Sequence, residues 1–316
     1  MIEAGGGDIG KAERLLWAGR LVAFPTETVY GLGADASSKD AIARLYEVKG
    51  RPGDHPVIVH FADAKKAFEW AREVPPAAHK LAAKFWPGPL TLILKRAPHV
   101  GDFVTGRQDT VGLRVPAHPL AHELLAAFGG GLAAPSANRF GRVSPTTAQH
   151  VRDDLGADVD LVLDGGPCGV GIESTIVDLS RGHAVLLRPG GIGVAELEAA
   201  LGEPVSLPDA EAPRVSGSLP AHYAPRTPAR LVGGEALEAE IARLGEAAAV
   251  LAFSAPDERV DFWLRMPKDP AAYAQKLYSA LRELDGTGSK MLLIETPPDS
   301  PAWRAVLDRL RRAARD

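Results

Sequence analysis

The sequence LVAFPTETVYGLGADA, residues 21–36, passes from an apolar run into a polar turn that contains glycine. The apolar run 21–24 is typical of a buried strand, and Pro25 fixes the direction in which the chain leaves it. Gly31 and Gly33 permit a tight backbone path through the turn. Three consecutive side chains that can form hydrogen bonds follow the strand: Thr26, Glu27 and Thr28. Because open sheets place ligand sites beyond their strand ends, the sequence predicts a strand followed by a site-bearing loop.

Strand-like and helix-like segments alternate on both sides of this stretch. An amphipathic helix capped by Asp8 and stopped at Gly19 precedes it. The predicted helices that follow are 40–49, 63–73, 77–85, 119–128, 146–155 and 194–201. The predicted strands that follow are 57–61, 90–94, 111–115, 159–163, 174–179 and 184–187. This mixture predicts an α/β or α+β domain built on a large twisted sheet.

The alternation is interrupted at residues 203–228, where proline, serine and small residues predict an extended segment without regular structure. A shorter alternation then resumes, with strands at 229–232, 248–253 and 290–295 and helices at 235–244, 271–284 and 302–314. The sequence therefore predicts three parts, which are a larger domain over 1–203, a proline-rich linker over 204–229 and a small α/β domain over 230–316.

The composition is that of a globular protein, with 46% hydrophobic and 24% charged residues and a net charge of −4. No apolar run of about 18 residues occurs, so no membrane-spanning helix is expected, and the first residues do not resemble a signal peptide. The single cysteine, Cys168, can form neither an internal disulfide nor a thiolate zinc site, which favours the cytoplasm. Since neither half of the chain is basic, tight non-specific binding of nucleic acid is not expected.

Three short patterns resemble cofactor sites but lack the context that such sites need. Residues 5–12 fit most of a phosphate-binding loop, but Ala12 replaces the required Ser or Thr and no strand precedes the pattern. The glycines of GLGADA at 31–36 do not open a helix directly after a strand, which argues against a dinucleotide site. His118 and His122 lack a nearby third ligand for a metal ion.

A second polar segment, KGRPGDHPVIVH at residues 49–60, follows a predicted helix and leads into a strand. Lys49 and Arg51 lie two residues apart, so both cations can face one cleft and neutralise the phosphates of a nucleotide. His55 and His60 bracket the strand, and His60 near its end is a candidate ligand contact. The alternative interpretation of this segment is a solvated loop.

Further polar residues interrupt apolar or glycine-rich stretches along the chain. Arg114 lies within the strand-like TVGLRV, where a buried guanidinium needs an anionic partner such as a substrate carboxylate. The segment LAAPSANRFGRVSPTT at 132–147 combines small residues with hydroxyls, and these can bind phosphate together with the next helix N-terminus. The other polar residues at strand ends or in turns are Ser136, Asn138, Ser144, Glu173, Ser174, Thr175 and Arg188.

These motifs, in this order, resemble the Sua5/YrdC/YciO family. They are FPTETVYGLGADA, KGRPGDHPVIVH, APSAN, GIESTIVDL and LLRPGGI, and the likeness extends over residues 10–230. HYAPRTP at 222–228 is similar to the linker that precedes the extra C-terminal domain of the long, Sua5-type members. The resemblance implies a YrdC-like twisted mixed sheet with helices, followed by a smaller Rossmann-like α/β domain.

The resemblance also implies an enzyme, a nucleotidyltransferase that makes L-threonylcarbamoyladenylate from L-threonine, bicarbonate or CO2, and ATP, and releases pyrophosphate. The product would supply the t6A modification at tRNA position 37 through a partner transfer machinery. Mg²⁺ would accompany the ATP, and no protein-derived metal ligand set is assigned. The implied setting is cytoplasmic, without a membrane and with at most weak RNA binding. Two alternatives are a module that binds double-stranded RNA or tRNA, and a YrdC-like carbamoyltransferase.

The same resemblance assigns the site residue by residue. The residues implied to hold L-threonine are Thr28, His60, Arg114, Ser174 and, through its backbone, Ala134. The residues implied to surround ATP are Lys49, Arg51, His55, Thr110, Ser136, Ser144, Arg188 and Tyr223, with Lys49 and Arg51 as the catalytic pair. The sequence departs from the family at His55, where asparagine is common. Tyr223 is expected to fold over the nucleotide as a lid.

Overall fold

The computed structural model describes residues 7–217 and 222–314, which form two compact units. Within these residues, the first unit comprises 7–140, 145–169 and 173–217. The second unit comprises 141–144, 170–172 and 222–314. Each unit contains its own sheet and its own hydrophobic core.

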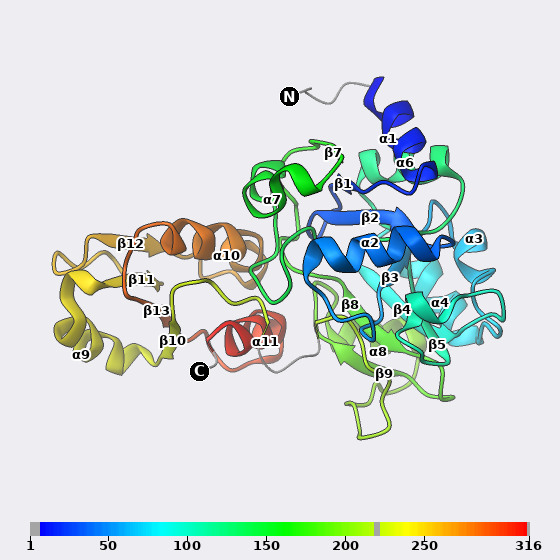
Figure 1. The fold of residues 1–316 in the computed structure, drawn as a ribbon. Coiled ribbons are helices and arrows are strands. Elements are labelled where there is room, and N and C mark those ends of the chain that lie inside the picture. The colour runs from blue at the N-terminus through cyan, green and yellow to red at the C-terminus, as the bar shows by residue number, and fades with distance from the viewer. Residues whose placement is uncertain (1–6, 218–221, 315–316) are drawn as a thin grey trace. The chain divides into compact units, whose positions relative to one another are not determined.

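The first unit is built on a mixed nine-stranded sheet in the order β7-β1-β2-β6-β3-β5-β4-β8-β9 (Figure 1). The strands are β1 Val22–Phe24, β2 Gly31–Asp35, β3 Ile58–His60, β4 Leu90–Lys95, β5 Thr110–Arg114, β6 Leu132–Ala133, β7 Leu161–Val162, β8 Thr175–Asp178 and β9 Val185–Arg188. Pairing is parallel in β1–β7, β3–β5 and β4–β8 and antiparallel between the other neighbours. The predicted α/β class with a mixed sheet is confirmed.

Helices of the first unit begin and end at residues suited to those positions. They are α1 Gly7–Trp17, α2 Lys39–Lys49, α3 Ala64–Phe68, α4 Pro76–Phe85, α5 Asp102–Thr105, α6 Pro119–Phe128, α7 Ala148–Leu155 and α8 Val194–Leu201, with a 3₁₀ turn at Gly156–Asp158. The Ser38 side chain caps α2 by accepting a hydrogen bond from the backbone N–H of Ala41. Gly50 ends α2 in the left-handed conformation, with φ 62°. This ending sets the direction of the loop that carries Arg51.

Side chains alternate between the two faces of this sheet, as the period of two in a strand requires. Leu92 of β4 and Leu113 of β5 belong to the large core that α2, α4, α7 and α8 complete on the first face. Val22 and Phe24 of β1 point to the second face, where α1 and α6 cover one end of the sheet. Ile93 of β4 also lies on the second face. The first face of the sheet therefore packs on one continuous hydrophobic core, whereas the second face packs on two smaller clusters.

The other end of the second face is covered by an irregular segment. Val215 packs there against Ile93 and Ile176, while Ser206 forms an isolated bridge with Val185. The described part of the proline-rich segment, up to residue 217, contains no helix or strand, in agreement with the prediction. Between the two covers, the second face carries polar side chains instead of a hydrophobic core.

The prediction of a loop at 31–36 is wrong, because Gly31–Asp35 forms β2. This strand pairs antiparallel with β1, with Phe24 opposite Gly31. A Cβ atom on Gly33 would lie 2.9 Å from Cε1 of Phe24, so glycine leaves the space that the aromatic ring occupies. Gly31 and Gly33 therefore lie within a strand, where the absence of a side chain makes room for neighbouring residues. Because glycine is depleted in strands, the sequence did not indicate a strand here.

Two helix predictions also need correction. The helix predicted at 63–73 ends at Phe68, because the following residues pair with the end of β4. Trp70 accepts a hydrogen bond from the N–H of Ala97, and Arg72 donates its N–H to Lys95. At the N-terminus, α1 begins at Gly7, so Asp8 lies in the first turn instead of at the cap.

The second unit contains a parallel four-stranded sheet in the order β10-β13-β11-β12. Its strands are β10 Ala229–Val232, β11 Ala248–Ala252, β12 Phe262–Arg265 and β13 Met291–Glu295. Its helices are α9 Gly234–Leu244, α10 Pro270–Asp285 and α11 Arg304–Ala313, with 3₁₀ turns at Gly245–Ala247 and Pro301–Trp303. The smaller α/β domain is confirmed. The prediction missed β12, an edge strand that lacks a continuous buried run.

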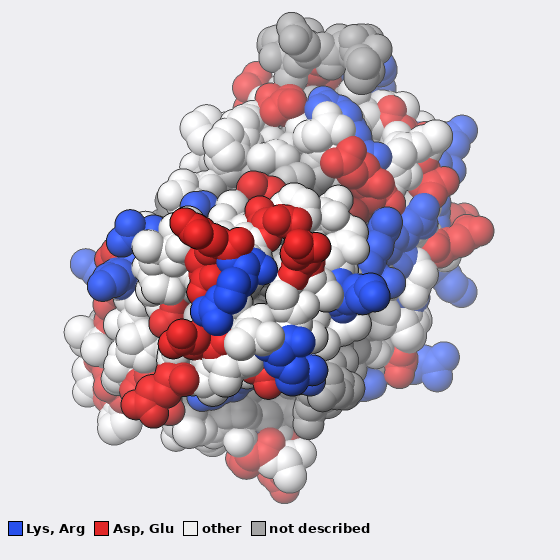
Figure 2. Space-filling model, turned by 90° about the vertical axis from the view of Figure 1, so that its left-hand side faces the viewer, with Lys and Arg blue, Asp and Glu red and all other residues white. Residues whose placement is uncertain are grey.

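None of the described helices is long and apolar enough to cross a membrane. Acidic and basic side chains are interspersed on the face shown in Figure 2.

Candidate functional site

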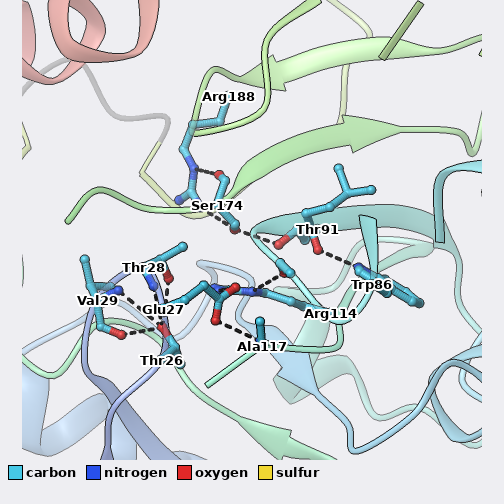
Figure 3. Close-up of polar contacts among 12 residues, drawn as sticks. Thr26, Glu27, Thr28, Val29, Trp86, Thr91, Arg114, Ala117, Ser174 and Arg188 are labelled. Atoms are coloured by element: carbon cyan, nitrogen blue, oxygen red, sulfur yellow. Dashed lines mark hydrogen bonds and ion pairs between the residues drawn. The ribbon is translucent and has the colours of Figure 1, made fainter. Parts of the chain in front are cut away.

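A group of threonine and glutamate side chains follows the end of β1. The Thr26 hydroxyl donates to the carbonyl of Val29 at 2.6 Å and accepts from the N–H of Thr28 and of Val29, each at 3.2 Å. It also lies 2.8 Å from the Thr28 hydroxyl, and both side chains are buried. Figure 3 shows this hydrogen-bonded turn. The side chain of Thr28, a predicted threonine contact, is therefore held in one orientation by its neighbours.

Glu27 is the anionic partner of Arg114. Its Oε1 accepts from Nη2 of Arg114 at 2.6 Å, and its Oε2 accepts from the N–H of Ala117 at 3.0 Å. Nε of Arg114 also donates to the carbonyl of Gly88 at 3.4 Å. Only 5% of the Arg114 side chain is exposed. The partner that the sequence argument assigned to a substrate carboxylate is thus supplied by the protein, and the remaining guanidinium N–H groups can still meet a second anion.

His60 lies beside Arg114 because parallel pairing of β3 with β5 places the two residues opposite one another. The ring is buried, and its Nδ1 has no hydrogen-bond partner among the described residues. Burial, followed by the nearby Arg114 cation, lowers the pKa of His60 from 6.5 to about 3. The imidazole is consequently neutral near pH 7 and offers a buried polar atom to a ligand.

A second hydrogen-bonded chain links β4, β8 and β9. The hydroxyls of Thr91 and Ser174 are 2.8 Å apart, and both side chains are buried. Arg188 donates from Nη2 to the Ser174 hydroxyl at 3.1 Å and from Nε to the Ser174 carbonyl at 3.0 Å. Since β4 lies between β5 and β8, this chain adjoins the Glu27–Arg114 pair, as Figure 3 shows. Sequence reasoning identified Ser174 and Arg188 but missed Thr91 and used Glu27 only as one polar residue of the turn.

Lys49 and Arg51 form another group, at the end of α2. The buried ammonium of Lys49 donates to the carbonyls of Ser136 and Asn138, the latter at 2.6 Å. Burial, followed by the Arg51 cation, lowers the pKa of Lys49 well below 10.5. Arg51 donates to the carbonyl of Pro56 at 2.7 Å. The two predicted phosphate contacts are therefore adjacent to one another, and both already hold loop carbonyls.

Aromatic rings surround the Arg51 group. The guanidinium carbon lies 6.0 Å from the ring centroids of both Tyr46 and Phe140. His55 contacts Phe140 edge to face, with ring centroids 5.4 Å apart. Burial, followed by the Arg51 cation, lowers the pKa of His55. Such a setting of cations and flat rings suits the phosphates and base of a nucleotide.

The loop after β6 connects these groups within the first unit. Ala134 donates its N–H to the carbonyl of Ile58 at 3.0 Å, two residues before His60 in β3. Ser136 forms an isolated bridge with Gly31 while its carbonyl accepts from Lys49. The predicted contacts Ala134 and Ser136 thus lie in one short loop that reaches both the β3 and the α2 groups.

Thr110, at the start of β5, lines a cleft of the first unit. Gly112 of β5 and Ile93 of β4 also line this cleft. The segment 214–216 lines it too, and Gln108 holds this segment through reciprocal hydrogen bonds of 2.7 and 2.9 Å with the backbone of Arg214. Arg188 also donates to the carbonyl of Ser216 at 2.8 Å.

Two predicted ATP contacts, Ser144 and Tyr223, belong to the second unit and not to the first. Both side chains are buried. The remaining predicted contacts all belong to the first unit. The first unit therefore gathers the predicted threonine contacts, and the predicted nucleotide contacts are divided between the two units.

The donor set of the first unit fits anions better than metal ions. Within residues 7–217 and 222–314, no three His, Cys, Asp or Glu side chains form a group that could hold a metal ion. The side chains described above are mainly cations and hydroxyls, which are donors toward carboxylate and phosphate oxygens.

The fold defines a two-domain α/β protein, and the site defines a set of buried anion-binding side chains on one face of its mixed sheet. Residues 14–190 match the family described as telomere recombination, which groups Sua5, YciO and YrdC proteins, and residues 192–315 match the C-terminal domain of threonylcarbamoyl-AMP synthase. The chain belongs to the Sua5/YciO/YrdC family, in its long form with the threonylcarbamoyl-AMP synthase C-terminal domain. The resemblance inferred from the motifs is confirmed.

Relatives with both domains are similar along almost the whole chain. The threonylcarbamoyl-AMP synthase of Pyrococcus abyssi is 40% identical over 313 residues, which are 94% of this chain and 91% of that protein. The Bacillus subtilis enzyme of the same name is 38% identical over 321 residues, covering 97% and 92%. The crystal structure of Pyrococcus abyssi Sua5 with L-threonine matches with a TM-score of 0.92 at 36% identity, covering 99% of this chain and 96% of that one.

Proposed function

We propose that this chain makes threonylcarbamoyl-AMP from L-threonine, bicarbonate or CO2, and ATP. The observation that carries the proposal is the convergence of the buried Glu27–Arg114 pair, neutral His60 and the Ser174 hydroxyl on one sheet face. Such a set matches a small zwitterion that also carries a hydroxyl. Support comes from the names of the relatives and from the threonine complex of the Pyrococcus abyssi protein.

In this site Arg114 binds the threonine carboxylate through the guanidinium N–H groups that Glu27 does not use. Thr28, His60 and Ser174 contact the hydroxyl and the amine, and the backbone of Ala134 adds a further contact. Because Thr26 and Thr91 already fix two of these side chains, little ordering is required when threonine binds. The site is therefore preorganised for one amino acid.

The reaction forms two bonds in sequence. The neutral amine of threonine adds to CO2, which creates the N–C bond and releases a proton, and the product is a carbamate. A carbamate oxygen then attacks the α-phosphorus of ATP, while the bond from that phosphorus to the bridging oxygen breaks and pyrophosphate leaves with the electron pair. No covalent enzyme intermediate is needed. Holding two ligands in the reacting geometry can contribute roughly 7–11 kcal/mol in ideal cases.

The cations of the first unit act on the phosphates. Arg51 and Arg188 neutralise charge that develops on the leaving group, and Lys49 fixes the loop of Ser136 through the carbonyls that it binds. His55, Thr110, Ser136 and Ser144 complete the surroundings of ATP. Mg²⁺ would accompany the nucleotide and would supply further neutralisation of its phosphate charge, in addition to that from Arg51 and Arg188.

Tyr223 acts as a lid in this proposal. A mixed anhydride is lost to water unless the site excludes it, and an aromatic side chain from the HYAP segment can provide that exclusion. Replacing Tyr223 with Ala is expected to shorten the lifetime of the intermediate on the enzyme, measured by the ratio of free hydrolysis products to intact product. An unchanged lifetime together with unchanged ATP affinity would remove the lid from the proposal.

The product supplies a tRNA-modifying machinery in the cytoplasm that attaches the threonylcarbamoyl group as t6A at position 37. RNA binding is at most a weak additional property. The net charge is −4, and acidic side chains are interspersed with basic ones on the face shown in Figure 2.

The test is an incubation of the chain with ATP, Mg²⁺, L-threonine and bicarbonate, followed by mass detection of the mixed anhydride. Omitting threonine is expected to abolish pyrophosphate release. The Arg114→Ala variant is expected to lose threonine binding before it loses ATP binding. Pyrophosphate release that is independent of threonine, or an absence of the anhydride, would refute the proposed function.

A further inference from the structure

Arg309 of α11 is a fully buried cation in the second unit. It has no solvent exposure and is the largest fully buried side chain of the described residues. Its Nη1 donates to Oδ2 of Asp308 at 2.6 Å. Burial of a guanidinium is costly even when it is paired, and an apolar residue would fill the same space at less cost. Stability alone therefore does not explain why an arginine occupies position 309.

The guanidinium of Arg309 lies over the ring of Tyr223, with its carbon 5.2 Å from the ring centroid. The ring of Tyr278, from α10, stacks with Tyr223 at a centroid distance of 5.8 Å and an interplanar angle of 29°. Tyr223 also has a left-handed backbone, with φ 62°, which a residue other than glycine adopts only when its surroundings support it. Helices α10 and α11 thus provide a specific seat for this tyrosine.

The preceding residue is tied to the same helix. His222 donates its N–H to the carbonyl of Arg312 at 3.4 Å, and Nε of Arg312 donates to Oδ1 of Asp308 at 3.0 Å. Asp308 therefore binds both Arg309 and Arg312. One short stretch of α11 therefore contacts both the backbone of the HYAP segment and the ring of Tyr223.

The same unit also holds the loop that carries Ser144. Arg282 of α10 donates to the carbonyl of Val143, and the N–H of Ala224 donates to the carbonyl of Gly141 at 2.9 Å. Arg142 and Ala224 form an isolated parallel bridge. The two nucleotide contacts that lie outside the first unit, Ser144 and Tyr223, are consequently fixed by contacts with α10 and with each other's segments.

We propose that Arg309 is a positioning residue for nucleotide binding, which it supports by holding the ring of Tyr223 within the second unit. This inference rests on the proposed function, because it takes Tyr223 as an ATP contact. Arg309 acts through the ring of Tyr223 and does not itself touch the ligand.

The experiment measures the dissociation constants of ATP and of L-threonine for the full chain by titration calorimetry. Arg309→Met is expected to weaken ATP binding about tenfold, the scale of a desolvated cation–π contact, and to leave threonine binding unchanged. Arg311→Met is the matched control, since 61% of that side chain is exposed on the same helix. Arg309→Met in a Tyr223→Leu background is expected to add nothing further, because both changes remove one interaction.

Circular dichroism establishes that each variant is folded, and Arg309→Gln, which also removes the cation, replaces Arg309→Met if the latter does not fold. A folded Arg309 variant with the ATP affinity of the unsubstituted chain overturns the inference, as does a loss that adds fully to that of Tyr223→Leu. An equal loss of threonine binding also overturns it. Product formation by the unsubstituted chain is scored separately, so a failure of the proposed function itself is recognised by the absence of the anhydride.

Discussion

Glu27 determines how Arg114 can be used. Their contact is 2.6 Å long, and the exposed fractions of the two side chains are 15% and 5%. Replacing Glu27 with Gln keeps the size but removes the charge, which leaves a buried guanidinium without its anion. We expect the free energy of unfolding to fall by about 3 kcal/mol, measured by denaturant titration, and the KM for threonine to rise.

Glu73 provides the control for this prediction. It pairs with Lys95 at 3.5 Å, and the exposed fractions of the Glu73 and Lys95 side chains are 65% and 39%. Glu73→Gln is expected to change the free energy of unfolding by less than about 1 kcal/mol. Equal effects of the two substitutions would mean that the Glu27–Arg114 pair is no stronger than a surface pair.

His60 makes stability depend on pH. Its pKa is about 3 in the folded chain and near 6.5 when unfolded, so between these values the unfolded state binds more protons. The contribution of neutral His60 is therefore complete above pH 6.5 and is lost as the pH falls. Between pH 6.5 and 5 the loss amounts to roughly 2 kcal/mol. A His60→Gln variant is expected to show a flatter dependence of its unfolding free energy over this window.

Above pH 5 most carboxyl groups stay ionised, so a change in stability between pH 5 and 6.5 comes mainly from the protonation of histidine. The matched variant is His55→Gln, because the pKa of His55 is also lowered but its side chain is 24% exposed. A His60→Gln profile as steep as that of the unsubstituted chain would show that other groups cause the acid sensitivity.

Residue identities alone predicted part of the site. The rest of the site could not be predicted in this way, because it depends on contacts that only the tertiary structure creates. Arg114 gave a signal because a cation within an apolar strand is unusual. Thr91 gave none, since threonine is an ordinary strand residue and only the pairing of β4 with β8 brings it to Ser174. Glu27 was visible as a polar residue, but its partner lies 87 positions away and is fixed by tertiary structure.

Strand β2 illustrates the same limit for a whole element. Its sequence, GLGAD, has no β-branched or aromatic residue, so local propensity did not predict a strand. The strand exists because it fills the sheet between β1 and β6. Helix α3, in contrast, was predicted too long because its apolar spacing continues through residues that pair with β4 instead.

The packing of β2 against β1 leads to a prediction for Gly33. A Cβ atom there would lie 2.9 Å from Cε1 of Phe24 and 3.0 Å from the carbonyl oxygen of Val22. Gly33→Ala is expected to lower the free energy of unfolding by about 1–3 kcal/mol, measured by denaturant titration. Gly53→Ala is the control, since a Cβ there meets no atom within 4 Å. If both variants are equally stable, β2 can shift to accommodate a Cβ atom at position 33, and the prediction is wrong.

At the scale of the whole molecule, sequence patterning predicted two α/β regions but not the way short stretches are distributed between them. Residues 141–144 and 170–172 belong to the second unit. The φ of Gly171 is +79°, and a Cβ there would lie 2.4 Å from Cα of Gln275 in α10. Such an approach of two backbones depends on residues more than a hundred positions apart, and no local pattern encodes it.

The separate cores of the two units lead to the last prediction. Leu113 of β5 and Leu293 of β13 are both fully buried, one in each core. Truncating either to Ala is expected to cost about 2–5 kcal/mol, but in different parts of the chain. In native-state hydrogen exchange, Leu293→Ala should reduce protection in β10, β11 and β13 while β4 and β5 keep theirs, and Leu113→Ala should do the reverse. If both variants lowered protection equally in both sheets, the units would unfold as one cooperative structure, and a role of the second unit in presenting Tyr223 would then be inseparable from the stability of the first.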